Sequence, residues 1–153
     1  MENKIRVKSK DLYVIEVNDA GDTISFDVTD IELPFRLERA KKMAEDAMKW
    51  LKLQKPIIAK KPERIAKGDL LSERDRAMLN TYKALYKKLR AAIDEFCGVG
   101  AADKIFGSQN YLEMFNDFIE QMQPHIDAMG VKSVDIKKRI EEKYNTPAAE
   151  DEI

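Results

Sequence analysis

Phe96-Cys97-Gly98-Val99-Gly100-Ala101-Ala102-Asp103-Lys104-Ile105-Phe106-Gly107 is the stretch around which this chain is organised. It separates the two clearest helical patterns of the sequence. Gly98 follows the first pattern, at the place where a residue with positive φ ends a helix, and Gly107 precedes the second. Between them, residues 101–106 have room for about one and a half helical turns. The glycines therefore predict a packed corner between two helices, with Gly98, Gly100 and Gly107 as its structural residues.

Before the corner, the sequence predicts a long helix that begins at Ser72, because Asp75 three residues later completes a capping-box pattern. Its apolar residues step by four and three along one broad face: Met78, Tyr82, Leu85, Leu89, Ala92 and Phe96, with Leu79, Tyr86 and Ile93 beside them. A face of this width predicts a helix at the centre of the fold.

After the corner, Ser108 is the expected N-cap of a third helix. Its apolar side holds Tyr111, Leu112, Met114, Phe115, Phe118, Ile119, Met122, Ile126 and Met129. Pro124 inside this pattern predicts a kink or a division, and Gly130 predicts the end. Ser133 begins a last, mostly charged helix, and residues 147–153 read as a disordered tail.

The N-terminal part predicts a β-hairpin over residues 11–28, where Ile24, Phe26 and Val28 alternate with polar residues. Ile5 and Val7 suggest a short additional edge strand. A lone hairpin is marginally stable in water, so its apolar face needs a cover.

Between the hairpin and Ser72, Thr29 and Glu32 fit a capping box, and a long helix with a small-residue seam is expected from about Pro34. Residues 54–71 contain two prolines and predict either a loop or a short turn around residues 63–67.

Together these patterns predict an α+β fold that is mostly α-helical, with an N-terminal β-hairpin followed by about four helices packed in one domain. At 153 residues, one domain is the expected number. Its predicted extent is residues 1–146, with the hairpin part at 5–28 and the helical part at 30–145.

Charge is unevenly distributed along a chain whose net charge is only −1. Residues 36–67 carry eleven Lys and Arg against four Asp and Glu, and residues 103–153 carry six against eleven. These are either two solvated helix faces or surfaces that pair, within one chain or between copies. The basic stretch could also contact nucleic acid, although it lacks interleaved aromatic residues for stacking.

No stretch approaches the roughly 20 apolar residues of a membrane span, and the N-terminus has no apolar signal region, so a cytoplasmic protein is expected.

Groups suited to catalysis are sparse. His125 is the single histidine and is expected to be a surface or packing residue and not a general base. Cys97 is the single cysteine and is expected to be a small buried hydrophobic residue, with a reactive thiol as the lesser alternative. The carboxylates are dispersed, so no catalytic residue, metal site or cofactor is expected. Gly98-Val99-Gly100 also resembles part of a phosphate-binding loop, but the P-loop lysine and the preceding strand are missing.

Two parts of the chain resemble tail assembly chaperones of long-tailed phages and prophages of Gram-positive bacteria. One is the hairpin with the helix that follows, residues 11–50, and the other is the corner with the third helix, residues 90–130. In that family a segment of the type F-G-x-G-x-x-x-x-I-F-G precedes a Phe-rich helix and a proline. Here Cys97 stands between Phe96 and Gly98.

The resemblance implies a non-enzymatic protein that coats the tape measure protein during tail assembly, helps to recruit tail tube subunits and tends to form homo-oligomers. Such proteins leave before the virion is complete. For contact with the client, the expected residues are Phe106, Phe115, Phe118 and Met122, each of which could equally be a core residue. The alternatives are another phage structural or protein-interaction module, and a nucleic-acid-binding domain that uses residues 36–67.

Overall fold

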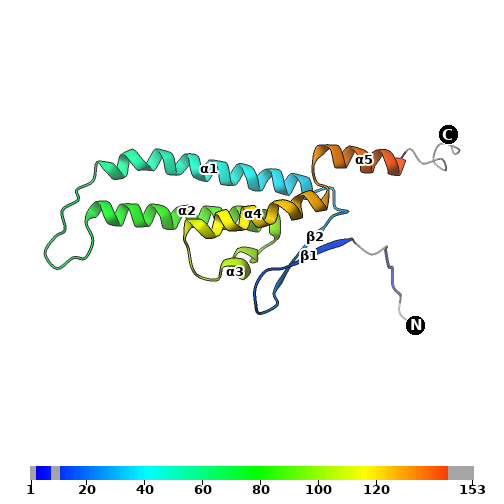
Figure 1. The fold of residues 1–153 in the computed structure, drawn as a ribbon, viewed down its shortest axis with the longest axis horizontal. Coiled ribbons are helices and arrows are strands. Elements are labelled where there is room, and N and C mark those ends of the chain that lie inside the picture. The colour runs from blue at the N-terminus through cyan, green and yellow to red at the C-terminus, as the bar shows by residue number, and fades with distance from the viewer. Residues whose placement is uncertain (1–2, 8–10, 145–153) are drawn as a thin grey trace.

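The computed structural model describes residues 3–7 and 11–144. Within them, the chain forms a hairpin followed by a mostly helical domain (Figure 1). The elements are β1 (Leu12–Glu16), β2 (Thr23–Asp27), α1 (Leu33–Ala59), α2 (Glu73–Cys97), α3 (Ala101–Phe106), α4 (Leu112–Met129) and α5 (Ser133–Tyr144). The predicted fold class is confirmed, and the predicted tail at 147–153 lies outside the described residues. None of the helices described combines the length and apolar character needed to cross a membrane.

The hairpin pairs β1 with β2 in antiparallel register, with Tyr13 opposite Phe26 and Ile15 opposite Ile24. This side of the hairpin faces the core, and Phe26 is only 2% exposed. Its ring lies 4.9 Å from the ring of Phe96 at the end of α2, so α2 supplies part of the cover that the hairpin needs. The expected edge strand is wrong: residues 3–7 form no strand, and Ile5 is 96% exposed.

Helices α1 and α2 lie side by side in opposite directions and form the longest part of the molecule (Figure 1). The predicted small-residue seam of α1 is confirmed, because Ala40 and Ala47 are buried. Ala47 and Leu51 of α1 form a cluster with Leu85 of α2, whose exposure is 0%. Small side chains at the seam let the two helices approach closely.

The start of α1 agrees with the expected long helix from about Pro34, because the helix begins at Leu33. The expected capping box is wrong: the backbone N–H of Thr29 donates to Asp27, and that of Glu32 donates to Asp30 and not to Thr29. At the other end, α1 continues past Pro56 to Ala59, where a loop was expected. The guanidinium of Arg74 explains this extension, because it donates to the carbonyls of Ala59 (2.7 Å) and Lys61 (2.9 Å) and so satisfies the helix end.

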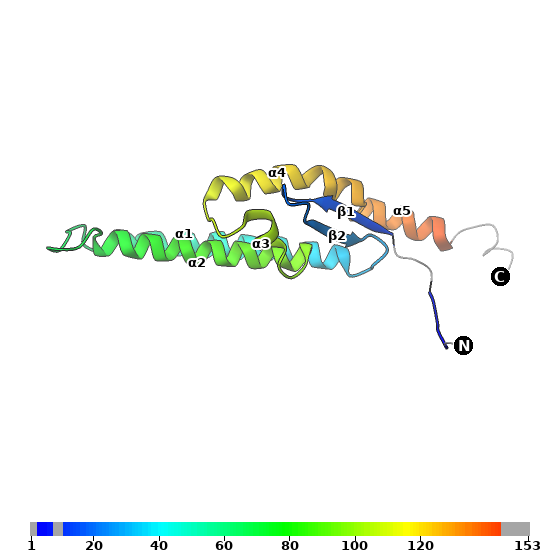
Figure 2. The same cartoon turned by 90° about the horizontal axis from the view of Figure 1, so that it is seen from below.

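Helix α2 begins as predicted, with reciprocal hydrogen bonds between Ser72 and Asp75. The hairpin and α3 form a middle layer, with α1 and α2 on one side of it and α4 on the other (Figure 2). Pro124 does not divide α4, which runs without a break to Met129 and ends at Gly130 as predicted.

The main core is formed where the hairpin, α1, α2, α3 and α4 meet. Its buried residues are Ile24, Phe26, Leu33, Ala40, Phe96, Cys97, Ala101, Met122, Ile126 and Met129, with Val131 just beyond α4.

Leu85→Ala should lower the free energy of unfolding by about 2–5 kcal/mol, because it removes a fully buried side chain between two long helices. Urea unfolding followed by circular dichroism measures this change. Leu53→Ala, on the exposed side of α1, is the matched control and should change stability by less than about 1 kcal/mol. Equal losses in the two variants would show that the contact of α1 with α2 is not a stabilising core.

Candidate functional site

The corner after α2 is built as the glycines predict. Gly98, Gly100 and Gly107 have φ angles of 107°, 84° and 64°, a region that residues with a Cβ rarely adopt. The carboxylate of Asp94 accepts hydrogen bonds from the backbone N–H of Ala102 at 2.8 Å and of Gly100 at 3.4 Å. This chain's own carboxylate thus fills the position at the start of α3 that a phosphate would occupy in a phosphate-binding loop.

Arg90 fixes the connection between α3 and α4. Its guanidinium donates to the carbonyls of Gly107 (2.8 Å) and Gln109 (2.7 Å) and to Oδ1 of Asn110 (2.8 Å). The expected N-cap at Ser108 is therefore wrong: Gly107 and Ser108 form a turn, Arg90 holds the connection against α2, and α4 begins only at Leu112. Arg90 was missed from the sequence, where it looks like any charged residue beside an apolar row.

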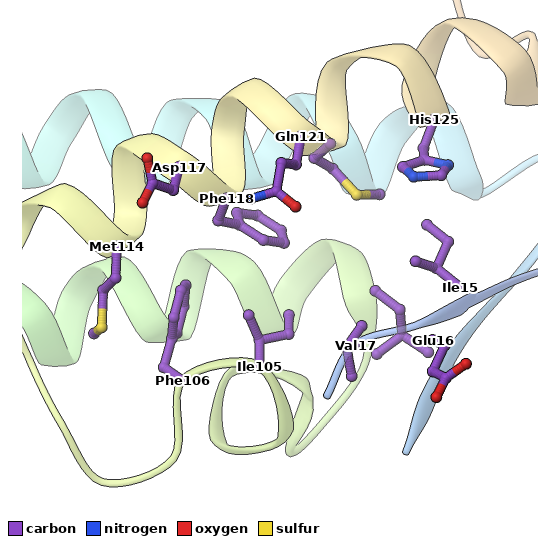
Figure 3. A pocket seen from close by; sticks show the side chains of 12 residues that line it. Ile15, Glu16, Val17, Ile105, Phe106, Met114, Asp117, Phe118, Gln121 and His125 are labelled. Carbon is purple, nitrogen blue, oxygen red and sulfur yellow. The ribbon is translucent and has the colours of Figure 1, made fainter. Parts of the chain in front are cut away.

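A groove of about 320 Å³ opens between the hairpin, α3 and α4 (Figure 3). Ile15, Val17 and Ile24 line it from the hairpin, Ile105 and Phe106 from α3, and Met114, Phe118 and Met122 from α4. The rings of Phe106 and Phe118 meet edge to face with centroids 5.8 Å apart. Two flexible methionine side chains beside them make a wall that can adapt to different apolar groups.

Three of the four residues expected to contact a client therefore line one groove: Phe106, Phe118 and Met122. Phe115 does not line it. This side chain is 3% exposed, lies behind Phe106 with ring centroids 4.8 Å apart, and stacks on Tyr86 of α2 at 5.5 Å. The hairpin wall was missed, because its contact with α3 and α4 is set by the tertiary fold and leaves no local signal in residues 15–24.

Polar groups occupy the ends and rim of the groove. His125 packs against Tyr13, whose hydroxyl lies within hydrogen-bond distance, 2.7 Å, of Nδ1. Glu16, Asp117 and Gln121 complete the lining, which contains no Lys or Arg. The groove can hold an apolar side chain, and its two carboxylates favour a segment that also carries positive charge.

Cys97 is buried in the core, as expected. Burial raises the pKa of its thiol to about 12, and the nearby Asp94 carboxylate adds to this effect while Arg36 opposes it. Among the described residues, no three His, Cys, Asp or Glu side chains are grouped so that they could hold a metal ion.

Comparisons of the chain with protein-family models, with curated proteins and with solved structures find no match in any of the three.

Asp94→Ala should lower the free energy of unfolding by about 0.5–2 kcal/mol, because it leaves the first N–H groups of α3 without their acceptor. Chemical denaturation measures the loss. Asp103→Ala is the control: it removes an ion pair with Arg90 whose carboxylate is 84% exposed, and a pair of this kind is worth about 1 kcal/mol or less. An Asp94 variant as stable as the Asp103 variant would rule out the capping role.

The Cys97 thiol should react with a disulfide reagent at pH 8 at least about a hundredfold faster in denaturant than in the folded protein, since burial blocks access and keeps the sulfur protonated. The raised pKa also predicts a sign for stability. Above about pH 8.5 the unfolded chain ionises this thiol and the folded chain does not, so stability falls as the pH rises towards 12. Cys97→Ala should show a shallower fall, and an identical pH profile would contradict the assignment.

Proposed function

We propose that this chain is a non-catalytic tail assembly chaperone of a long-tailed phage or prophage, acting in the host cytoplasm. In this role it binds the tape measure protein, helps to recruit tail tube subunits and acts as a homo-oligomer. The proposal combines the resemblance of residues 11–50 and 90–130 with one structural observation, the groove at the corner. That groove unites Phe106, Phe118 and Met122, three of the four residues that the sequence analysis expects to contact a client.

The dimensions of the groove suit a temporary client. A volume of about 320 Å³ accommodates one or two large apolar side chains, which is little for a permanent complex. A client with repeated apolar residues can be held by many copies, each with one weak contact, and released when tube subunits replace them. Adaptable methionines also suit a client whose sequence varies along its length.

An alternative function is also compatible with the groove. Another phage structural or protein-interaction module would use the same groove, but it would remain in purified virions, and a chaperone would not. Residues 36–67 remain available for the nucleic-acid alternative, which requires binding that weakens steeply with salt.

The test is co-expression with the protein encoded immediately downstream, followed by size exclusion with light scattering. We expect a long helical neighbour that is insoluble alone and that elutes with several copies of this chain. Gln121→Trp should reduce the recovered complex at least about fivefold, because an indole would fill the groove without removing any packed side chain.

Ile119→Asp is the matched control, because Ile119 is exposed on α4 and does not line the groove. Phe118→Asp is a second groove variant, and its unfolding midpoint separates lost binding from lost folding. A neighbour that stays insoluble beside the unaltered chain would refute the chaperone proposal, and a complex unaffected by Gln121→Trp would refute the groove.

A further inference from the structure

The distal arm is the part of α1 and α2 that extends beyond α4, residues 48–83 (Figure 1). Only these two helices and their connection form it, with a small cluster of Ala47, Leu51 and Leu85 at its base. The broad apolar face of α2 predicts a helix at the centre of the fold. The N-terminal part of this face is not covered, because Met78 and Leu79 are 41% and 52% exposed.

An open groove of about 470 Å³ follows this exposed part of α2. Its lining is Met78, Leu79, Tyr82, Lys83 and Tyr86 of α2, together with Asn110. The α2 residues recur at helical spacing and so share one side of the helix. At one end of the row, the ring of Tyr86 is covered by Phe115 of α4, in a stacked contact at 5.5 Å. The row therefore begins under α4 and continues without cover along the arm.

Charge distinguishes the two helices that meet at Tyr86. Residues 76–93 of α2 contain five Lys and Arg and no Asp or Glu. Residues 112–129, the span of α4, contain four Asp and Glu and no Lys or Arg. Burial raises the pKa of the Tyr86 phenol, and Tyr82 and the Glu113 carboxylate of α4 add to this effect. The covered end of the row thus shows what kind of element it accepts, an acidic amphipathic helix.

We propose that the open groove on α2 binds an acidic amphipathic helix of a partner protein, laid along the arm in line with α4. The exposed Met78 and Leu79 and the half-buried Tyr82 receive its apolar side, and Lys83 and Lys87 face its carboxylates. A second copy offers no such helix among the described residues: the apolar side of its α4 is buried, and α5 carries four Lys and Arg against three Asp and Glu. This inference goes beyond the proposed function and uses a surface separate from the corner groove.

The probe is a fluorescein-labelled synthetic peptide with the sequence of residues 110–130, an acidic amphipathic helix that already packs at one end of this row. Fluorescence anisotropy with the full chain should give saturable binding. Leu79→Asp should weaken it at least about tenfold, since an exposed apolar contact becomes a like charge. A peptide in which Glu113, Asp117 and Glu120 are replaced by Lys should bind at least about tenfold more weakly than the original.

Leu53→Asp, on the α1 side of the arm and outside the groove, is the matched control and should leave the affinity within about twofold. Absence of saturable peptide binding, or an equal loss in both variants, overturns the proposal. A chain that dimerises by itself and becomes monomeric with Leu79→Asp assigns the groove to a second copy and overturns it too. So does displacement of the peptide by a short DNA duplex. None of these outcomes depends on the co-expression partner.

Discussion

The rest of the structure depends on the carboxylate of Asp94, which accepts from the backbone of Gly100 and Ala102 and so turns the chain after α2. Six residues are too few for a helix to persist alone, so α3 needs this acceptor at its start. Once α3 is fixed, Phe106 reaches α4, and Arg90 holds the connection that follows. Helix α4 can then help to cover a two-stranded hairpin that would be marginal alone.

The corner also explains why the molecule offers two surfaces of different character. Where the hairpin, α3 and α4 converge, three separate segments leave a groove whose lining has two carboxylates, Glu16 and Asp117. Where α4 begins too late to cover α2, an apolar row with basic neighbours stays open. One connection of fixed length therefore sets both the closure of the core and the position of the exposed row. The opposite charges of the two grooves suit different partner segments.

Local sequence patterns were sufficient to predict the hairpin, the capping box at Ser72 and the glycines that end α2, α3 and α4, because each of these features depends on residues that are close together in the chain. The errors arise where a distant side chain intervenes. Arg74 extends α1 through Pro56, and Arg90 delays the start of α4. For the site, the aromatic and methionine residues of α3 and α4 were identifiable, but their division into groove (Phe106, Phe118) and core (Phe115) was not. That division depends on which elements cover which face, and periodicity carries no such information.

The apolar interior is divided into two clusters, one at the meeting of the hairpin with the helices and one, smaller, between α1 and α2 at Ala47, Leu51 and Leu85. Amide hydrogen exchange separates such units, because the one with fewer buried contacts opens at a lower free energy. The amides of the arm beyond Leu51 should thus exchange through local opening. The amides near Phe96 and Met122 should exchange only through global unfolding. The end of α1 and α2 that forms the arm should therefore open at a lower free energy than the end that packs on the hairpin.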